Sequence, residues 1–537
     1  MQNKKWFQDA VLYQIYPQSF ADSNADGIGD IRGVIDRLDY IKSLGVDALW
    51  FNPCFESPFV DAGYDVSDYL KIAARYGTNA DMEELIGKAK QAGIRILLDL
   101  VAGHTSIDHP WFQKELHNQG KSAEGDRFVW TEALPKDWDS TLPGTPAWVK
   151  SPGPRQGWYL KNFFDEQPAL NFGWVNPDPN QPWQDSIDAL GPLRNIESLI
   201  EIIDFWLSRG VSGFRIDMAF SLIKDYDTNL SQSESAKIWQ RIRKWMDKKY
   251  PEAILIPEGS EPRQAGDLAF DADFFLVIFK EHSSLFNNQS AGRLPFHEPR
   301  SAFFDSAGLG ATNIFTDGWQ KIKNEDPNRL VVMAAADHDF NRLNSGSRTQ
   351  EQLGAAFTLL MTWGTVPCIW YGDEIGMRYI PDLPNKEGAI CNPGYNRAGC
   401  RTPMQWDGSL NAGFSVADPE QIYLPIDPSE SRPTVAEQDQ SKDSTLNLVR
   451  SLIQLRKEHP ALGTRENVSV VCADYPFIYK RGTSHMVALN PKAESVEIDL
   501  PEMENASNLF GRGISIAGSV VSFEPFSFGV FKIEAKN

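Results

Sequence analysis

The sequence is poor in cysteine, in basic charge and in long apolar runs, and each shortage excludes a class of protein. Lys and Arg number 52 against 72 Asp and Glu, and the resulting formal charge of −20 argues against a nucleic acid or an anionic membrane surface as the partner. The N-terminus has no apolar segment of signal-peptide length, and no run is long enough to cross a membrane. We therefore expect a soluble, cytoplasmic protein, and its oligomeric state is left open.

The five cysteines form no CxxC pair, and an odd number fits reduced thiols better than a disulfide framework. The alternative is a disulfide between Cys391 and Cys400, which would close a small loop. We interpret the negative net charge as a means of keeping the protein soluble. The alternative is that it reflects a neutral or cationic ligand.

The 537 residues exceed one compact core, so two or three domains are expected, and 42% hydrophobic and 12% aromatic residues supply large cores. Apolar runs alternate with helical patterns such as 78–93, 193–210 and 235–251. This alternation predicts an α/β protein with parallel βα units, and a (β/α)8 TIM barrel fits better than a doubly wound sheet, because no Gly-rich phosphate turn follows the first run. The strand-like runs are 10–17, 46–53, 94–101, 213–219, 253–258, 271–279, 330–337 and 366–374.

Two regions interrupt the alternation. Residues 105–171 are rich in Trp, Pro, Gly and Asp without helical period, which predicts a small inserted domain after the third strand. After residue 462 short alternating segments predict a C-terminal antiparallel β-sandwich over 463–537. The barrel would then comprise 1–104 and 172–462, with a long loop at 378–433.

Acidic residues recur at the ends of the predicted strands. Because the carboxyl ends of parallel strands meet on one rim of a barrel, acids far apart in sequence are expected to converge there. A helix N-cap is the alternative role for any single one of them, above all for Asp99. The strand-end acids are Asp99, Asp217, Glu258 and Asp339, and His104 and His338 lie near two of them.

Two motifs that would indicate other chemistries for such a group of acids are missing from the sequence. There is no HExxH pattern for a metal hydrolase and no G-x-S-x-G turn for a serine nucleophile. Paired carboxylates beside apolar and aromatic side chains suit glycoside cleavage, in which one acts as nucleophile or base and the other as acid.

With these residues in place, the chain resembles the α-amylase superfamily, glycoside hydrolase family 13, over nearly its whole length. The ordered matches are "GVDALWFNP", "AGYDVSDY", "DLVAGHTS", "QPALN", "GFRIDMA", "IPEG", "ADHDFNR" and "GTVPCIWYGDEIGM". The stretch "RTPMQWDGSLNAGFS" from Arg401 is similar to the branch of oligo-1,6-glucosidases, α-glucosidases and trehalose synthases.

The resemblance implies a role for each matching residue. Asp217 would be the nucleophile, Arg215 would keep it ionised, and Glu258 would be the general acid/base. Asp339 would bind the sugar hydroxyls. Among the other matches, His104 and His338 correspond to hydrogen-bonding partners of the sugar, Tyr64 to its stacking platform, and Asp65 and Arg401 to the pair that closes the pocket for exo action on a small neutral α-glucoside.

An acidic loop near the start resembles a calcium site. Asp22, Asn24 and Asp26 alternate, a glycine follows, and the Ile28 carbonyl and Asp30 complete an EF-hand-like beginning without the usual glutamate. A polar turn with Asx caps is the alternative. Since the glucosidase branch has a similar loop, we expect a structural Ca²⁺ and no organic cofactor.

Four positions depart from the family's usual residues, namely Gly103, Ala169, Pro257 and Asp337. They are expected to affect substrate choice more than the reaction itself. In the glucosidase branch the residue after the nucleophile is tied to linkage preference, and Met218 matches neither common choice, so 1,4 or 1,6 specificity stays open. Glu261 is a weaker rival to Glu258. The function expected is therefore a retaining α-glucosidase, with a glucosyl isomerase or transferase as the alternative and a catalytically inactive scaffold relative as the remote one.

Overall fold

The computed structural model describes residues 5–118, 120–135, 145–226, 229–258, 269–275, 280–286, 302–305, 307–346, 348–390 and 395–533. Within them, each of the eight predicted apolar runs contains one strand of a single eight-stranded sheet. Its order is β12-β9-β5-β2-β1-β15-β14-β13. The strands are β1 (Leu12–Ile15), β2 (Ala48–Phe51), β5 (Arg95–Val101), β9 (Gly213–Asp217), β12 (Ile254–Pro257), β13 (Asp273–Phe275), β14 (Val331–Ala334) and β15 (Val366–Trp370).

These strands are buried along nearly their whole length, as expected for a sheet covered on both faces. Their described pairs, β1 with β15, β14 with β15, β5 with β9 and β12 with β9, are all parallel. The (β/α)8 barrel class is thereby confirmed. The three predicted helices are also present as α4 (Asn79–Gln91), α6 (Leu190–Leu207) and α7 (Gln232–Lys249).

The chain divides into two compact units, which are described separately. The first unit contains residues 50–91 and 95–273, and the second contains 2–49, 92–94 and 274–537. The domain limits expected from the sequence stay predictions.

In the first unit, the segment predicted as an inserted domain carries a small antiparallel sheet in the order β6-β8-β7. Aromatic residues fill its core, where the Phe112 and Trp130 rings stack at 5.2 Å. The remaining elements of this unit are β3 (Phe55–Glu56), β4 (Asp68–Ile72), α5 (Pro110–Leu116), β6 (Trp130–Thr131), β7 (Trp148–Lys150), β8 (Trp158–Leu160), β10 (Lys224–Asp225) and β11 (Asn229–Leu230).

The second unit contains the first barrel helices, the last barrel helices and the C-terminal strands. Its α-helices are α1 (Lys5–Gln8), α2 (Ile31–Asp36), α3 (Leu38–Leu44), α8 (Lys280–Phe286), α9 (Asn313–Glu325), α10 (Gln350–Thr362), α11 (Val435–Gln440) and α12 (Thr445–Glu458). Short 3₁₀ turns occupy η1 (Pro17–Ser19), η3 (Asp373–Ile375), η4 (Arg397–Cys400), η5 (Leu410–Gly413), η6 (Pro460–Leu462) and η7 (Pro501–Met503).

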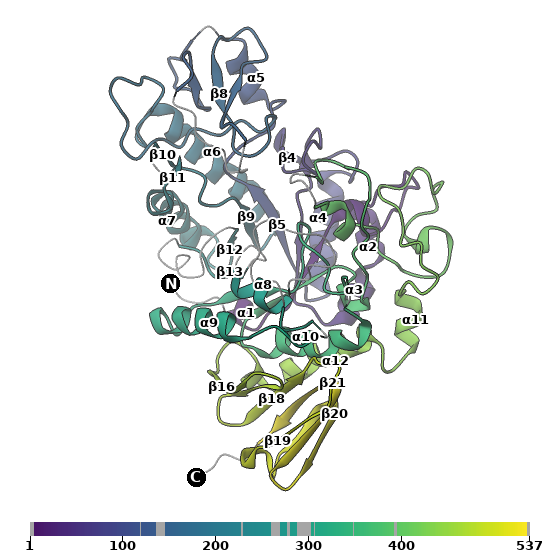
Figure 1. The fold of residues 1–537 in the computed structure, drawn as a ribbon. Coiled ribbons are helices and arrows are strands. Elements are labelled where there is room, and N and C mark those ends of the chain that lie inside the picture. Colours follow the sequence, from purple (N-terminus) through teal and green to yellow (C-terminus); the bar gives the residue numbers. More distant parts are fainter. Residues whose placement is uncertain are drawn as a thin grey trace. The chain divides into compact units, whose positions relative to one another are not determined.

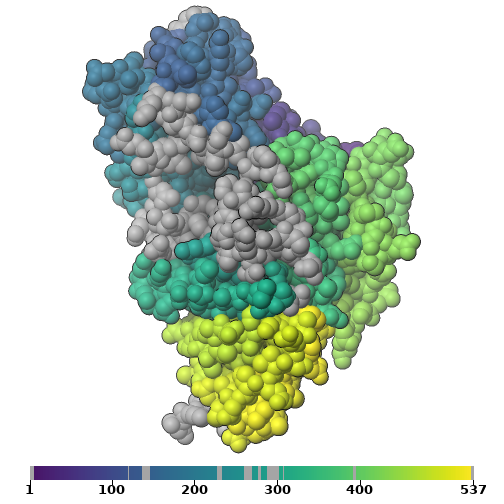
Figure 2. Space-filling model, in the orientation of Figure 1, coloured from purple at the N-terminus to yellow at the C-terminus, as the bar shows by residue number. Residues whose placement is uncertain are grey.

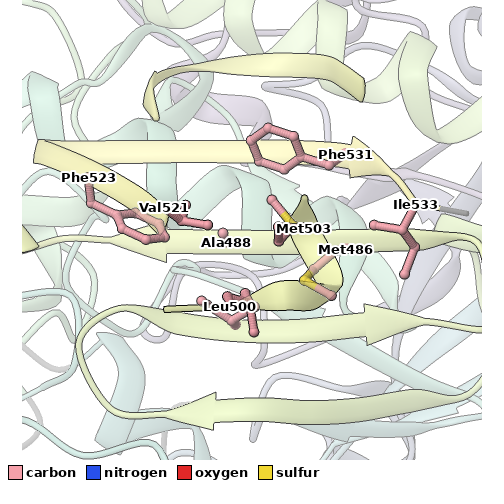
Figure 3. Close-up of a cluster of buried hydrophobic side chains, with 9 residues drawn as sticks. Met486, Ala488, Leu500, Met503, Val521, Phe523, Phe531 and Ile533 are labelled. Atoms are coloured by element: carbon pink, nitrogen blue, oxygen red, sulfur yellow. The ribbon is translucent and has the colours of Figure 1, made fainter. Parts of the chain in front are cut away.

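The segment predicted as a C-terminal antiparallel β-sandwich is an antiparallel β domain, and its six described strands join in one sheet (Figure 1). Helix α10 packs on β18 and β21, and Figure 2 shows the strands as one block of yellow atoms. Figure 3 shows its buried core, with Met486, Ala488, Leu500, Met503, Val521, Phe523, Phe531 and Ile533 labelled. The strands are β16 (Val468–Ala473), β17 (Phe477–Arg481), β18 (His485–Asn490), β19 (Val496–Asp499), β20 (Ser507–Ala517) and β21 (Val520–Lys532).

Candidate active site

Arg215 and Asp217 lie on the same side of β9, as their spacing in a strand requires. Arg215 Nη1 is 3.0 Å from Asp217 Oδ1, and the arginine side chain is only 1% exposed. The neighbouring strand β5 pairs in parallel register with Asp99 opposite Arg215, and Arg215 Nη1 is 2.9 Å from Asp99 Oδ1. The buried guanidinium is therefore held between two carboxylates from adjacent strands.

Glu258 reaches the same arginine from the other neighbouring strand. The ladder of β12 and β9 pairs Pro257 with Ile216, and the Glu258 N–H continues it by donating to the Ile216 carbonyl at 2.9 Å. Arg215 Nη2 lies 2.5 Å from Glu258 Oε1. The two acids predicted for catalysis thus contact one guanidinium, from strands that lie side by side.

A backbone amide also holds Glu258. The Met218 N–H donates to Glu258 Oε2 at 3.0 Å. Met218 has a φ of +43°, a left-handed conformation that is uncommon for a residue with a side chain. This strained turn immediately after Asp217 aims the amide at the acid.

The carboxyls of Asp217 and Glu258 are electrostatically linked. Burial is the largest cause that raises the pKa of Asp217 well above its usual value, and the Glu258 charge adds to it, while Arg215 acts in the opposite direction. The nearby Glu258 side chain thus favours the protonated form of Asp217. The pKa of Asp217 is therefore set by burial and by the neighbouring acid as well as by Arg215.

Tyr64 and His104 lie in the same unit. The Tyr64 hydroxyl donates to Asp99 Oδ2 at 3.1 Å, and its backbone carbonyl is 3.1 Å from His104 Nε2. Asp99 also accepts a hydrogen bond from Trp50 Nε1 at 3.2 Å. Asp99, for which the sequence left a purely structural role open, therefore orients both Arg215 and Tyr64.

Asp65 is fully buried within its own turn. Its carboxylate accepts hydrogen bonds from Ser57 Oγ at 3.0 Å, Val60 N at 2.8 Å and Asp61 N at 3.0 Å. Burial is the main cause that raises the pKa of Asp65 to about 6. The backbone hydrogen bonds from Val60 and Asp61 lower this pKa but do not outweigh the burial. Its predicted pairing with Arg401 stays a prediction.

A second cluster lies in the second unit, after β14. Asp339 Oδ1 is 3.0 Å from both Arg397 Nη1 and Arg401 Nη2, and Asp339 Oδ2 is 3.1 Å from His338 Nε2. Burial alone would raise the pKa of Asp339, but His338, Arg397 and Arg401 together hold it well below the usual value. Asp339 is thus a permanently ionised carboxylate at neutral pH.

Arg397 was not singled out from the sequence, although it precedes Arg401 by only four residues. Its Nη2 also donates to the Gly388 carbonyl at 2.6 Å. The only signal available was a second arginine in the segment after the last barrel strand, because the contact to Asp339 joins residues 58 positions apart.

The predicted calcium loop folds as a series of capped turns. Asp22 accepts hydrogen bonds from the N–H groups of Asn24, Ala25 and Gly27 and from Ser415 Oγ, while Asp30 caps α2 through the Gly33 N–H at 2.6 Å. Gly27 has a φ of +87°, and a Cβ there would lie 2.3 Å from the Gln421 carbonyl oxygen. Asn24 and Asp26 are exposed, and Asp26 accepts one hydrogen bond, from Ile28 N. These oxygen ligands fit Ca²⁺ by their chemistry.

Two residues considered in the sequence, Glu261 and Cys391, lie outside the described part of the chain. The four cysteines that are described, Cys54, Cys368, Cys400 and Cys472, are free thiols. Among the helices of the described residues, none has the length and hydropathy needed to cross a membrane.

The chain is similar to known proteins over most of its length. The profile of the family "Alpha amylase, catalytic domain" matches residues 14–464. The chain is 31% identical over 495 residues to the trehalose synthase/amylase TreS of Mycobacterium tuberculosis, covering 85% of this chain and 76% of that protein. It is 31% identical over 517 residues to the glucan 1,6-alpha-glucosidase of Streptococcus pneumoniae, covering 89% of each.

A solved structure also resembles the fold closely. The α-glucosyl transfer enzyme XgtA superposes with a TM-score of 0.82 at 26% sequence identity, covering 98% of this chain and 99% of that one.

Proposed function

From the membership of this chain in the α-amylase family, we propose that it is a retaining, exo-acting α-glucosidase on short α-glucosides. It is a glycoside hydrolase, since the oligo-1,6-glucosidase of Parageobacillus thermoglucosidasius is a further relative, 30% identical over 88% of this chain. The observation that carries the proposal is the contact of one buried guanidinium, Arg215, with both Asp217 and Glu258.

In the first step, Asp217 attacks the anomeric carbon while Glu258 donates its proton to the glycosidic oxygen. The C–O bond to the leaving sugar breaks, the leaving group departs as an alcohol, and glucose becomes esterified to Asp217. This step needs Asp217 ionised, the form that the Arg215 charge favours, and Glu258 protonated.

In the second step, Glu258 removes a proton from water, the hydroxide oxygen bonds to the anomeric carbon, and Asp217 leaves as a carboxylate. Two inversions restore the α configuration. Retaining enzymes hold the two carboxyls about 5–5.5 Å apart. Glu258 is the more exposed of the two side chains, as suits the acid that must reach the glycosidic oxygen.

The other assigned roles follow from the resemblance. Tyr64 and His104 would contact the sugar, with Tyr64 fixed by Asp99. In the second unit, the ionised Asp339, flanked by His338 and Arg401, is suited to accept hydrogen bonds from sugar hydroxyls. Closure of the pocket by Asp65 and Arg401, and hence exo action, belongs to the same proposal.

The calcium site is also proposed here. Asp22, Asn24, Asp26, Asp30 and the Ile28 carbonyl would hold the ion, which would stabilise the loop and take no part in bond cleavage. A cytoplasmic location stays a prediction.

Transfer of the glucosyl group to a second sugar is the alternative function. It is favoured by the relatives named as a trehalose synthase/amylase and an α-glucosyl transfer enzyme. The test is incubation with maltose, isomaltose, sucrose and trehalose, with all products identified. Free glucose alone supports hydrolysis, rearranged disaccharides support the transferase or isomerase, and no reaction with any α-glucoside contradicts both.

A further inference from the structure

His104 is held through both of its ring nitrogens. Nε2 lies 3.1 Å from the Tyr64 carbonyl oxygen, and Nδ1 lies 3.0 Å from Asn162 Nδ2. A carbonyl oxygen only accepts hydrogen bonds, so the proton of the ring must be on Nε2. The remaining question is whether Nδ1 is protonated as well.

The surroundings of the ring oppose a second proton. His104 is 1% exposed, and burial is the main cause that lowers its pKa to about 3. The hydrogen bond to Tyr64 raises the pKa, and the Lys224 charge lowers it further. The ring is therefore neutral, and Nδ1 is an acceptor. The part of Asn162 that faces it must be the NH₂ group.

The other contacts of Asn162 require the same orientation of its amide. The NH₂ group is 3.1 Å from Ser221 Oγ, and the amide oxygen faces Lys224 Nζ at 3.5 Å. Lys224 Nζ also donates to the Ser221 carbonyl. Burial lowers the pKa of Lys224 to about 7, and in its ammonium form it only donates, which puts the oxygen of Asn162 on the lysine side and the NH₂ on the histidine side.

Gly103 makes room for this amide. A Cβ at position 103 would lie 2.3 Å from Ser221 Oγ and 2.8 Å from Asn162 Nδ2. The departure from the family at Gly103, where an asparagine usually precedes the histidine, thus has a physical reason. The Ser221 hydroxyl and an amide from the inserted segment together occupy the space that a side chain at 103 would need.

We propose that Asn162 is a positioning residue that holds His104 as the neutral tautomer with its proton on Nε2. The Nε2 proton is then directed at the Tyr64 carbonyl, a sugar hydroxyl near it would be a second acceptor, and His104 acts as a hydrogen-bond donor and not as an acid or base. The statement about the sugar rests on the proposed function, whereas the tautomer does not.

The test uses the full-length protein with ¹⁵N-labelled histidine, with the His104 signal assigned by its loss in His104→Gln. In the wild type at pH 7 we expect a neutral ring protonated at Nε2. In Asn162→Asp, an acceptor-only carboxylate faces Nδ1, and we expect both nitrogens to be protonated. A wild-type proton on Nδ1, or an unchanged signal in Asn162→Asp, would overturn the proposal.

A second variant covers the case in which Asn162→Asp does not fold. Asn162→Ala removes the donor that stabilises the neutral ring, and we expect the pKa of His104, measured by NMR titration, to rise by about one unit, the equivalent of one hydrogen bond. No rise would contradict the proposal. Asn195→Asp is the matched control, because Asn195 is also buried in this unit but bonds to Arg127 and Asn171.

Activity separates this inference from the proposed function. If the wild type cleaves α-glucosides, Asn162→Asp should lower kcat/KM about tenfold or more, while Asn195→Asp loses stability without that loss. If the wild type cleaves none, the proposed function fails, and the NMR result still decides the role of Asn162.

Discussion

Arg215 lies 2.5 Å from Glu258, closer than its 3.0 Å contact with Asp217. The resemblance assigned this arginine to the nucleophile alone, but the structure makes it the common partner of both acids. Burial lowers the pKa of Arg215, yet Asp99 and Glu258 outweigh it and raise the pKa well above its usual value. A permanent cation therefore sits between the two predicted catalytic groups.

The first prediction concerns the nucleophile. Asp217→Asn should lower glucoside turnover by about 10⁴-fold or more, because an amide cannot form the glucosyl ester. The measurement is kcat on an aryl α-glucoside, with an unchanged circular dichroism spectrum as evidence of folding. Asp178→Asn, an exposed turn position, is the control. Activity near that of the wild type would remove Asp217 from the mechanism.

The second prediction is that the same variant does not lose stability at pH 7. The folded-state pKa of Asp217 is raised, so between its unfolded and folded pKa values the native state binds more protons and stability falls as pH rises. Replacing the ionisable group by an amide removes that cost. We expect a melting temperature equal to or above that of the wild type at pH 7, and a clear decrease would contradict this account of the pair.

The third prediction is the opposite result for Asp339→Asn. Its pKa is depressed, so ionised Asp339 contributes stability that is present above the unfolded pKa, about 4, and lost as pH falls through the lower folded pKa. The neutral amide leaves Arg397 and Arg401 without their shared anion, at a cost of about 3 kcal/mol. Urea unfolding at pH 7 measures it, and equal stability of the variant and the wild type would show that these ion pairs contribute little.

The fourth prediction concerns Arg397. Because it bonds to Asp339, Arg397→Gln should destabilise the protein in the wild-type background and much less in the Asp339→Asn background, with a coupling energy of about 1–3 kcal/mol. Arg378→Gln, which breaks the ion pair to Asp427 in the same unit, should show additive effects with Asp339→Asn. If the effects of Arg397→Gln and Asp339→Asn were additive, the contact between Arg397 and Asp339 would contribute nothing to stability.

The fifth prediction concerns calcium. Added Ca²⁺ should raise the melting temperature of the wild type, since a ligand that binds only the folded state stabilises it. Asp26→Asn keeps the turn acceptor for Ile28 N but removes a charged ligand, so this increase should shrink, whereas Asp178→Asn should retain it. If Ca²⁺ shifts neither protein, the loop is a polar turn.

The strands, the barrel class and the position of Arg215 and Asp217 on one side of a strand could be predicted from the sequence alone. These features depend on local patterns, namely apolar runs separated by helical periods and a two-residue repeat within one strand. The order of the family's motifs also located Glu258 and Asp339. Burial along the strands then confirmed what the apolar runs predicted.

Which charged groups meet in the site could not be predicted from local patterns and follows from the fold. Arg397 at Asp339, Glu258 at Arg215 and Asn162 at His104 are contacts between segments 43 to 58 residues apart, and no local period records them. The opposite pKa shifts of Asp217 and Asp339 have the same origin, because burial and neighbouring charge are set by which strands and loops lie side by side. Identical side chains acquire different chemistry from their surroundings.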